Sequence, residues 1–216
     1  MTMLKKDYRE APDLQIEKRL WNQGYDYVLG MDEAGRGAWA GSVTVGAVIY
    51  NADEDLGEKL FGVRDSKQMT ARQRTLWAER IKDYSSSWSV GSATEKEIDS
   101  YGIVKAVQLA ASRAIEALHI IAQYMIIDYF HLPSETIPQE SFIKGDRKSI
   151  TIASASILAK TKRDEMMISY GEMYTFYGFA KHKGYGTREH CLALKQYGIS
   201  PIHRLSFLPM KGMVNP

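Results

Sequence analysis

The stretch YDYVLGMDEAGRGAWAGSVTVGAVIY, residues 25–50, decides the fold. Both of its ends are apolar runs rich in Val, Ile and Tyr, which is typical of strands, and between them lie Gly35, Gly37 and Gly41. Glycine adopts the positive φ values of tight turns without steric cost. The stretch therefore predicts two central antiparallel strands joined by a glycine-rich turn.

Outward from this hairpin, the chain alternates helical and strand patterns. Helices are predicted over residues 13–22, 70–84, 103–118, 150–167 and 187–198, and further strands over 86–93 and 124–130. The helix over 150–167 is rich in Ala and Ser, so it can lie close against the sheet. The alternation predicts a mixed α/β fold.

The composition is that of one globular unit. A chain of 216 residues with 44% hydrophobic and 25% charged residues, without repeats or Gly/Ser linkers, excludes a disordered protein. We expect an N-terminal helical appendage over residues 1–24 and a single domain over 25–216. No apolar run approaches the ~18 residues that span a bilayer, and the N-terminus lacks the pattern of a secretory signal, so a cytoplasmic protein is expected.

The cysteine and histidine residues argue against a zinc site. Cys191 is the single cysteine, which excludes an internal disulfide and a four-thiolate site. The spacing of His182, His190 and His203 matches none of the usual zinc pairs. We expect these histidines to be ordinary hydrogen-bonded side chains.

Basic residues concentrate in the C-terminal half, although the net charge of the whole chain is only +2. Residues 144–164 contain six Lys and Arg against two Asp, and residues 181–204 contain five against one Glu. This asymmetry favours a polyanionic ligand held by the C-terminal half. A pair of merely solvated helix faces is the alternative.

Four acidic residues occupy unusual positions. Asp128 interrupts an apolar strand, Asp32 and Glu33 stand where the first strand enters the glycine turn, and helical spacing puts Asp164 on the face that touches the sheet. If these carboxylates converge they repel one another, and two divalent cations with oxygen ligands, magnesium or manganese, would relieve the repulsion. For each acid taken singly, a strand-end Asp in water or a surface ion pair remains the commoner explanation.

Two glycine turns carry further candidates. In GRGAWAG, residues 35–41, the glycines let main-chain N–H groups approach a ligand, although a hairpin with positive φ explains them as well. In KHKGYGT, residues 181–187, Tyr185 stands among three basic or histidine residues, where its ring could stack on a sugar or base. The alternative is a turn whose tyrosine covers the core.

Seven motifs together resemble the ribonuclease HII family. They are GMDEAGRG at 30–37, DSK at 65–67, IID at 126–128, KGDRKS at 144–149, SASILAKTKRD at 154–164, YGFAKHKGYGT at 177–187 and HRLSF at 203–207. All are collinear with the family's motifs. The resemblance implies a ribonuclease H-like fold, with a mixed five-stranded sheet flanked by helices and a helical C-terminal portion.

The resemblance also implies the site residues. The catalytic, metal-binding residues would be Asp32, Glu33, Asp128 and Asp164, holding two magnesium or manganese ions. Main-chain groups of Gly35, Arg36 and Gly37 would read the 2′-hydroxyl of a ribonucleotide, and Tyr185 would stack on the next sugar. Lys67 and Lys144 would hold backbone phosphates. This sequence departs from the family's pattern at three positions. Relatives usually carry proline and a smaller apolar residue where Ala38 and Trp39 stand, and a small residue where Tyr129 stands.

The implied activity is that of an endoribonuclease. It would cleave on the 5′ side of ribonucleotides embedded in duplex DNA and in RNA·DNA hybrids, leaving 3′-hydroxyl and 5′-phosphate ends, and a monomer would suffice. The alternatives are the sister type HIII, a noncatalytic RNA·DNA-binding module, and a dimeric recombinase or junction resolvase.

Overall fold

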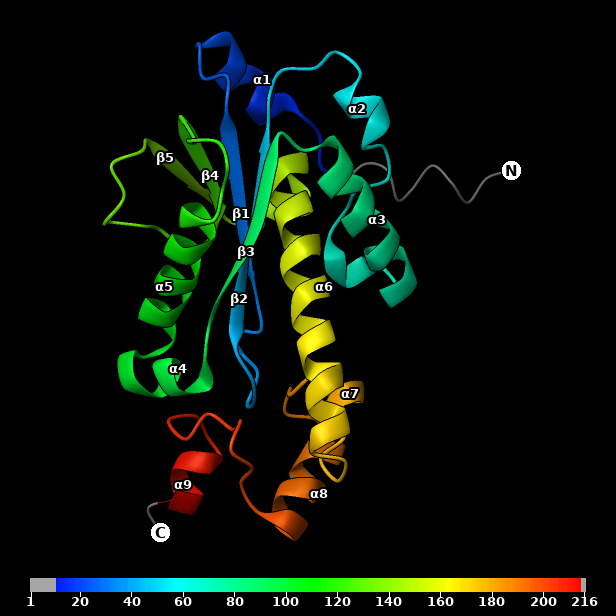
Figure 1. Ribbon diagram of the computed structural model, residues 1–216, viewed down its shortest axis with the longest axis vertical. Helices are drawn as coiled ribbons and strands as arrows, with labels where there is room; N and C mark the ends of the chain where they lie inside the picture. The colour runs from blue at the N-terminus through cyan, green and yellow to red at the C-terminus, as the bar shows by residue number, and fades with distance from the viewer. Residues whose placement is uncertain (1–10, 215–216) are drawn as a thin grey trace.

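The computed structural model describes residues 11–214, and five strands form one mixed sheet in the order β3-β2-β1-β4-β5 (Figure 1). The strands are β1 (Val28–Ala34), β2 (Val43–Tyr50), β3 (Ser87–Ala93), β4 (Tyr124–Asp128) and β5 (Gln139–Phe142). Strand β1 lies at the centre, antiparallel to β2 and parallel to β4. The predicted central hairpin and the five-stranded mixed sheet are confirmed.

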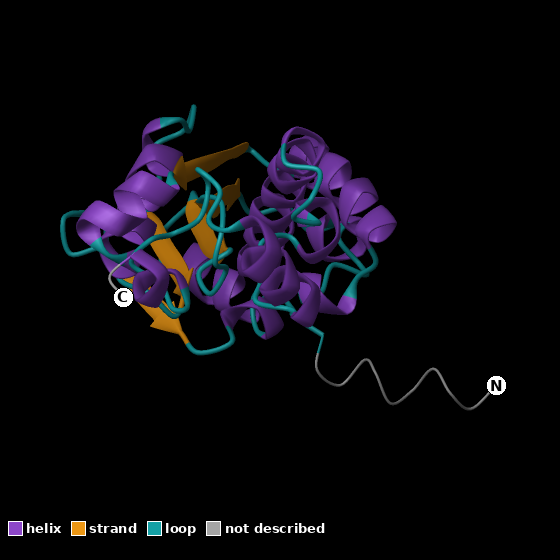
Figure 2. Cartoon of the chain, turned by 90° about the horizontal axis from the view of Figure 1, so that it is seen from below, coloured by secondary structure: helices purple, strands orange, loops and turns teal. Residues whose placement is uncertain are grey.

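Helices cover both faces of the sheet (Figure 2). Helix α5 (Ile103–Glu116) packs on one face, while α6 (Ile150–Met173) and α3 (Ala71–Tyr84) lie on the other. The remaining helices are α1 (Gln15–Asn22), α2 (Leu56–Lys59), α4 (Glu95–Tyr101), α7 (Phe179–His182), α8 (Arg188–Tyr197) and α9 (Met210–Val214), with 3-10 turns η2 (Ser66–Gln68) and η3 (Gly145–Arg147). No helix within residues 11–214 is both long and apolar enough to cross a membrane.

Helix α6 approaches β1 and β2 closely because glycines face it. A Cβ on Gly46 would lie 2.1 Å from the Ala155 carbonyl oxygen, and a Cβ on Gly30 would lie 2.6 Å from the Thr151 carbonyl carbon. The small residues of α6 and these two glycines therefore fix the helix against the strands that carry the candidate acids. The close packing predicted for residues 150–167 is confirmed.

Helix α1 is joined to the start of α6 by Glu17, which is fully buried. Its Oε1 accepts hydrogen bonds from Ser149 Oγ at 2.5 Å and from the Thr151 N–H at 3.0 Å. Ser149 is the N-cap of α6, so Glu17 satisfies donors at the positive end of that helix. The division into an appendage over 1–24 and a domain over 25–216 stays a prediction, and residues 1–10 lie outside the described part.

Several short elements were not predicted from the sequence, and β5 and α4 are two of them. Strand β5 is a four-residue edge strand, parallel to β4, whose residues QESF are partly exposed, so no alternation marks it. Helix α4 is a seven-residue helix that begins with a capping box of Thr94 and Glu97. The helices predicted from residues 70 and 187 have Thr70 and Thr187 as their N-caps, and each threonine side chain accepts a hydrogen bond from the main-chain N–H of the third residue of its helix.

Candidate active site

Asp32 lies in the central strand β1, and only 4% of its surface is exposed. Its Oδ1 accepts a hydrogen bond from the Glu33 main-chain N–H at 2.7 Å, and Ser156 of α6 also hydrogen-bonds the carboxyl group. Burial raises the pKa of Asp32 well above its ordinary value, and the charges of Glu33 and Asp128 raise it further. The site therefore favours a proton or a cation beside this carboxyl group.

Glu33 is half-buried and has one free oxygen. Its Oε1 lies 3.4 Å from Arg36 Nη1, whereas Oε2 is buried without a hydrogen-bond partner among the described residues. Burial raises the pKa of Glu33, although the Arg36 guanidinium partly offsets this. A buried carboxylate oxygen without a donor costs free energy, so this oxygen can gain from a proton donor or a cation.

Two further carboxyl groups come from β4 and from the turn η3. Asp128 ends β4, and its Oδ1 accepts a hydrogen bond from the Gly145 N–H at 2.7 Å. Asp146, which follows Gly145 in η3, is only 4% exposed. Burial raises the pKa of Asp146 most, and the charges of Asp65 and Asp128 raise it further. Burial likewise raises the pKa of Asp128. We call the four residues Asp32, Glu33, Asp128 and Asp146 the acid cluster.

A lysine stands beside the acid cluster. Lys67 lies in η2, two residues after Asp65, whose Oδ1 accepts a hydrogen bond from the Lys67 N–H. Burial opposes the charge on Lys67, but the carboxylates of Asp146 and Asp32 with their neighbours raise its pKa above the ordinary value. Its ammonium group therefore remains charged next to the carboxylates. Lys144, the other predicted phosphate contact, is exposed and takes the left-handed conformation immediately before Gly145.

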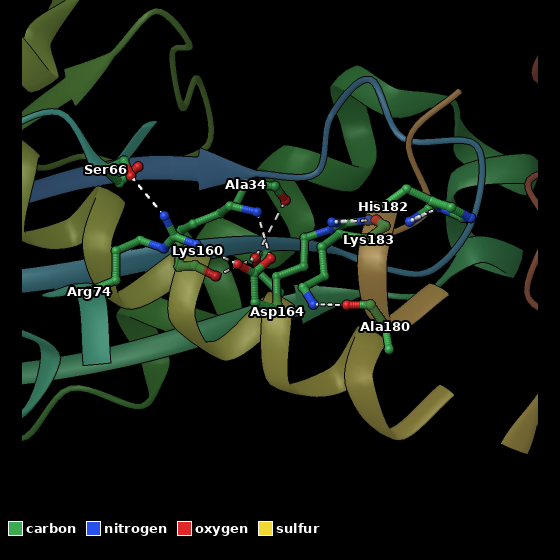
Figure 3. Close-up of polar contacts among 12 residues, drawn as sticks. Ala34, Ser66, Arg74, Lys160, Asp164, Ala180, His182 and Lys183 are labelled. Atoms are coloured by element: carbon green, nitrogen blue, oxygen red, sulfur yellow. Dashed lines mark hydrogen bonds and ion pairs between the residues drawn. The ribbon is translucent and has the colours of Figure 1, made fainter. Parts of the chain in front are cut away.

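Asp164 is not brought to this cluster. It is buried, as the helical spacing predicts, but Arg74 Nη2 lies 3.0 Å from its Oδ2 and Lys160 Nζ lies 2.5 Å from its Oδ1 (Figure 3). It stands eight residues beyond Ser156 on α6, which is about 12 Å further along the helix axis. The structure thus places Asp164 in an ion-pair network, and Asp146, which the sequence analysis did not select, takes the fourth place in the cluster.

Two buried arginines hold the turn of residues 35–42. Arg163 donates hydrogen bonds to the carbonyls of Ala40, Ser42 and Lys183, and Arg204 donates to those of Arg36, Gly41 and Ser42. Both side chains are fully buried. Gly35 has φ 91° and touches Arg163, because a Cβ there would lie 1.9 Å from Arg163 Nε. No atom lies within 4 Å of the Cβ position at Gly37, so that part of the turn is open.

Tyr185 stands on the neighbouring turn, between Gly184 and Gly186, and is 37% exposed. The Arg163 guanidinium lies 5.3 Å from its ring centroid, and Lys160 Nζ lies 5.9 Å from it. The Trp39 N–H donates to the Gly184 carbonyl at 2.8 Å, which joins the two turns. The departure at Trp39 is accommodated because a Cβ on Gly186 would lie 2.2 Å from the Trp39 ring.

The three histidines form a buried hydrogen-bonded network, as the sequence analysis expected. The Ser200 N–H donates to His203 Nδ1, so His203 carries its proton on Nε2 and donates it to His190 Nε2, 2.9 Å away. His190 in turn uses its Nδ1–H to donate to the Tyr185 carbonyl at 3.0 Å. His182 stacks on His190 with ring centroids 4.4 Å apart. This network fixes the backbone of the turn that carries Tyr185.

The histidine network predicts acid-sensitive stability. Burial lowers the pKa of His190 and of His203 to about 4, whereas an unfolded histidine titrates near 6.5. Above about pH 6.5 both histidines are neutral in the folded and the unfolded protein, so the free energy of unfolding is at its full value. As the pH falls from 6.5 toward 4 only the unfolded protein gains the protons, and the free energy of unfolding decreases by up to about 3 kcal/mol for each histidine. We expect His203→Gln, which keeps the Nε donor but does not titrate, to flatten this loss in urea unfolding series between pH 7 and 4.5. Parallel curves for parent and variant would contradict the assignment.

The fold defines a class. A mixed five-stranded sheet in the order β3-β2-β1-β4-β5, flanked by helices, is a ribonuclease H-like fold. The family model described as Ribonuclease HII matches residues 29–210. A curated Ribonuclease HII from Desulfitobacterium hafniense (strain DSM 10664 / DCB-2) is 46% identical over 202 residues, covering 94% of this chain and 76% of the relative. The chain belongs to the ribonuclease HII family and is a ribonuclease.

Solved structures agree with this assignment. The ribonuclease H2 of Pyrococcus horikoshii OT3 superposes with a TM-score of 0.73 at 27% identity, covering 87% of this chain and 96% of that one. The Bst-RNase HIII in complex with Mn2+ superposes with a TM-score of 0.66 at 19% identity, covering 87% of this chain and 69% of that one, which is a likeness of fold. The expected ribonuclease H-like fold and the expected family are confirmed.

Proposed function

We propose that this ribonuclease cleaves the phosphodiester on the 5′ side of ribonucleotides embedded in duplex DNA, and RNA in RNA·DNA hybrids, leaving 3′-hydroxyl and 5′-phosphate ends. The observation that carries the proposal is the contact between the acid cluster and the 35–37 turn. Glu33 and Arg36 are three residues apart and form an ion pair of 3.4 Å. Carboxylates suited to phosphodiester chemistry therefore lie next to main-chain groups suited to reading a sugar.

The acid cluster fits divalent cations, magnesium or manganese. Glu33 Oε2 is buried without a donor, and burial raises the pKa values of all four carboxyl groups, so each would gain from a neighbouring positive charge. Within residues 11–214, no three such side chains already enclose a metal position. We infer that the Glu33 side chain rotates when cations bind, so that its free Oε2 can join them. The similar Bst-RNase HIII fold is described in complex with Mn2+, which supports this assignment.

Asp32, Glu33, Asp128 and Asp146 would hold two such ions. When bound, the ions supply an activated water at neutral pH and stabilise charge on the leaving 3′ oxygen. The chain itself keeps Asp32 and Asp128 in place through the Glu33 and Gly145 N–H groups. The Lys67 ammonium stands at the edge of the cluster, where it would contact a substrate phosphate.

The 35–37 turn would distinguish RNA from DNA. A 2′-hydroxyl is both donor and acceptor, and only a ribonucleotide offers it. The open backbone at Gly37 and the fixed carbonyl of Arg36 present groups that can meet it, with Gly35 packed on Arg163 behind them. We propose main-chain recognition of the ribose by this turn.

The remaining contacts would be made along the backbone of the substrate. The Tyr185 ring would stack on the sugar that follows the ribonucleotide, while Lys67 and the exposed Lys144 would neutralise phosphates. We propose that a monomer carries out the reaction in the cytoplasm, where a chain with the single cysteine Cys191 needs no disulfide.

The direct test is a labelled DNA duplex that contains one ribonucleotide, incubated with the protein with and without magnesium. We expect a single magnesium-dependent nick on the 5′ side of the ribonucleotide, and none in the all-DNA duplex. Binding without a nick would favour a noncatalytic RNA·DNA-binding module. Cleavage restricted to four-way DNA junctions would favour the recombinase or resolvase alternative.

Replacing Tyr185 should weaken recognition of the ribonucleotide junction. Tyr185→Ala removes the ring but leaves its main chain, which His190 and Trp39 hold through the turn. Loss of one stacking contact, ~1–3 kcal/mol, corresponds to a five- to 150-fold rise in KM for the single-ribonucleotide duplex. Steady-state cleavage measures it, with Tyr185→Phe as the control that keeps the ring. Equal KM values for the parent and Tyr185→Ala would remove the stacking role.

A further inference from the structure

Tyr129 has the most unusual environment beside the acid cluster. It follows Asp128 directly, its φ is 67°, and 65% of its surface is exposed. The left-handed conformation favours glycine, and a bulky residue there is strained. Its main chain is fixed nonetheless, because the Tyr129 N–H donates to the Phe142 carbonyl at 2.9 Å and the Phe130 N–H donates to the Asp128 carbonyl at 2.8 Å.

Strain of this kind is confined to the surroundings of the site. Within residues 11–214, three residues other than glycine have positive φ, namely Tyr129, Lys144 and Lys183. Lys144 precedes the glycine that binds Asp128, and the Lys183 carbonyl accepts a hydrogen bond from Arg163. Backbone strain retained at the edges of a site is characteristic of residues selected for a task other than stability.

The Tyr129 ring also contacts a residue of the substrate-reading turn. The Arg36 guanidinium lies 5.3 Å from the ring centroid while its Nη1 lies 3.4 Å from Glu33 Oε1. A cation over a ring face orients both groups. The ring is therefore held beside the acid cluster, and most of the surface of Tyr129 is exposed.

Sheet order separates Tyr129 from the other exposed tyrosine of the site. Tyr129 follows β4, on one side of β1. Tyr185 lies against Arg163, which hydrogen-bonds the residues leading into β2, on the opposite side of β1. A nucleic-acid strand lying across the acid cluster would meet a tyrosine ring at each flank.

We propose that Tyr129 is a second substrate-contacting residue, whose ring packs on a sugar or base of the nucleic acid at the flank opposite Tyr185. This inference rests on the proposed function. Ring contacts with nucleic acid tolerate any sequence, since every base and sugar offers an apolar face. Tyr129 thus strengthens binding of the strand without selecting a base, and Arg36 keeps the ring in the binding position.

The experiment compares three variants in cleavage of the single-ribonucleotide duplex, with kcat, KM and thermal unfolding measured for each. Tyr129→Gly suits φ 67°, and Tyr129→Asn also tolerates it but has no ring. For both we expect a KM raised about tenfold, equivalent to ~1.4 kcal/mol, kcat within about threefold of the parent because Gly145 still positions Asp128, and a Tm not below that of the parent. Tyr129→Phe keeps the ring and should restore KM to within about twofold of the parent.

The outcomes separate the inference from the function on which it rests. A parent protein that does not nick the duplex contradicts the proposed function itself. A parent that nicks it, together with a Tyr129→Gly variant whose KM is unchanged, overturns the role of Tyr129 alone. A Tyr129→Phe variant as impaired as Tyr129→Gly, or a lowered Tm in both glycine and asparagine variants, assigns Tyr129 a structural role and likewise overturns the inference.

Discussion

Asp128→Asn is expected to abolish cleavage of the single-ribonucleotide duplex while leaving binding largely intact. The amide keeps the size of the side chain, and its oxygen can still accept the Gly145 N–H at 2.7 Å. The substitution removes one negative charge from the acid cluster, whose proposed role is to hold cations. Loss of one charged group that stabilises the transition state costs about 4 kcal/mol, which corresponds to a fall in kcat of about 10³-fold.

The measurement is single-turnover cleavage beside a binding titration with the same duplex. Asp83→Asn, an exposed acidic residue on α3, is the matched control for the loss of one negative charge. A noncatalytic binding module would show equal behaviour for the parent and Asp128→Asn in every assay. Retention of more than about a tenth of the parental rate would remove Asp128 from the proposed centre.

The second large effect concerns the fourth acid of the centre. Asp146 is buried beside Asp128, and their charges interact, whereas Asp164 is paired with Arg74 and Lys160. We expect Asp146→Asn to lower kcat at least about 10²-fold with little change in stability. Asp164→Asn leaves two partly buried cations without a carboxylate, so we expect it to lower the free energy of unfolding by about 3 kcal/mol and to reduce kcat less than tenfold.

For each variant, kcat is measured at a temperature where the protein is fully folded, and the free energy of unfolding is measured by urea titration. The comparison is informative because the two substitutions are chemically identical. The reverse pattern, with a stable and inactive Asp164→Asn, would return the metal-ligand role to Asp164 as the family resemblance implied.

The case of Asp164 shows what helical periodicity predicts and what it does not. The period placed Asp164 on the inner face of its helix correctly, since 8% of its surface is exposed. Periodicity gives the face but not the height along the axis, and α6 is 24 residues long, so its inner face continues past the carboxylates of the sheet. At that height the partner is Arg74 from α3, a contact between residues 90 positions apart.

Asp146 was missed for a related reason. It stands in KGDRKS, among basic residues, where it reads as a charge within a basic segment. Its burial depends on β5 and η3 folding back beside β4, and β5 has no alternating pattern. The hairpin, the long helix and the acids of β1 and β4 follow from local patterns, whereas the positions of η3, Tyr129 and the buried arginines depend on long-range packing that local patterns do not encode.

The two buried arginines lie where the turns of residues 35–42 and 181–187 meet, the two turns that we propose contact the substrate. Arg204 holds carbonyls of the 35–42 turn, Arg163 holds carbonyls of that turn and of Lys183 in the segment that carries Tyr185, and the Trp39 N–H donates to the Gly184 carbonyl. Opening either turn breaks the Arg163 and Trp39 hydrogen bonds that also hold the other. Local unfolding of this region is therefore cooperative, and the amide hydrogens of Trp39 and Gly41 should exchange with solvent at a common rate, as members of one foldon.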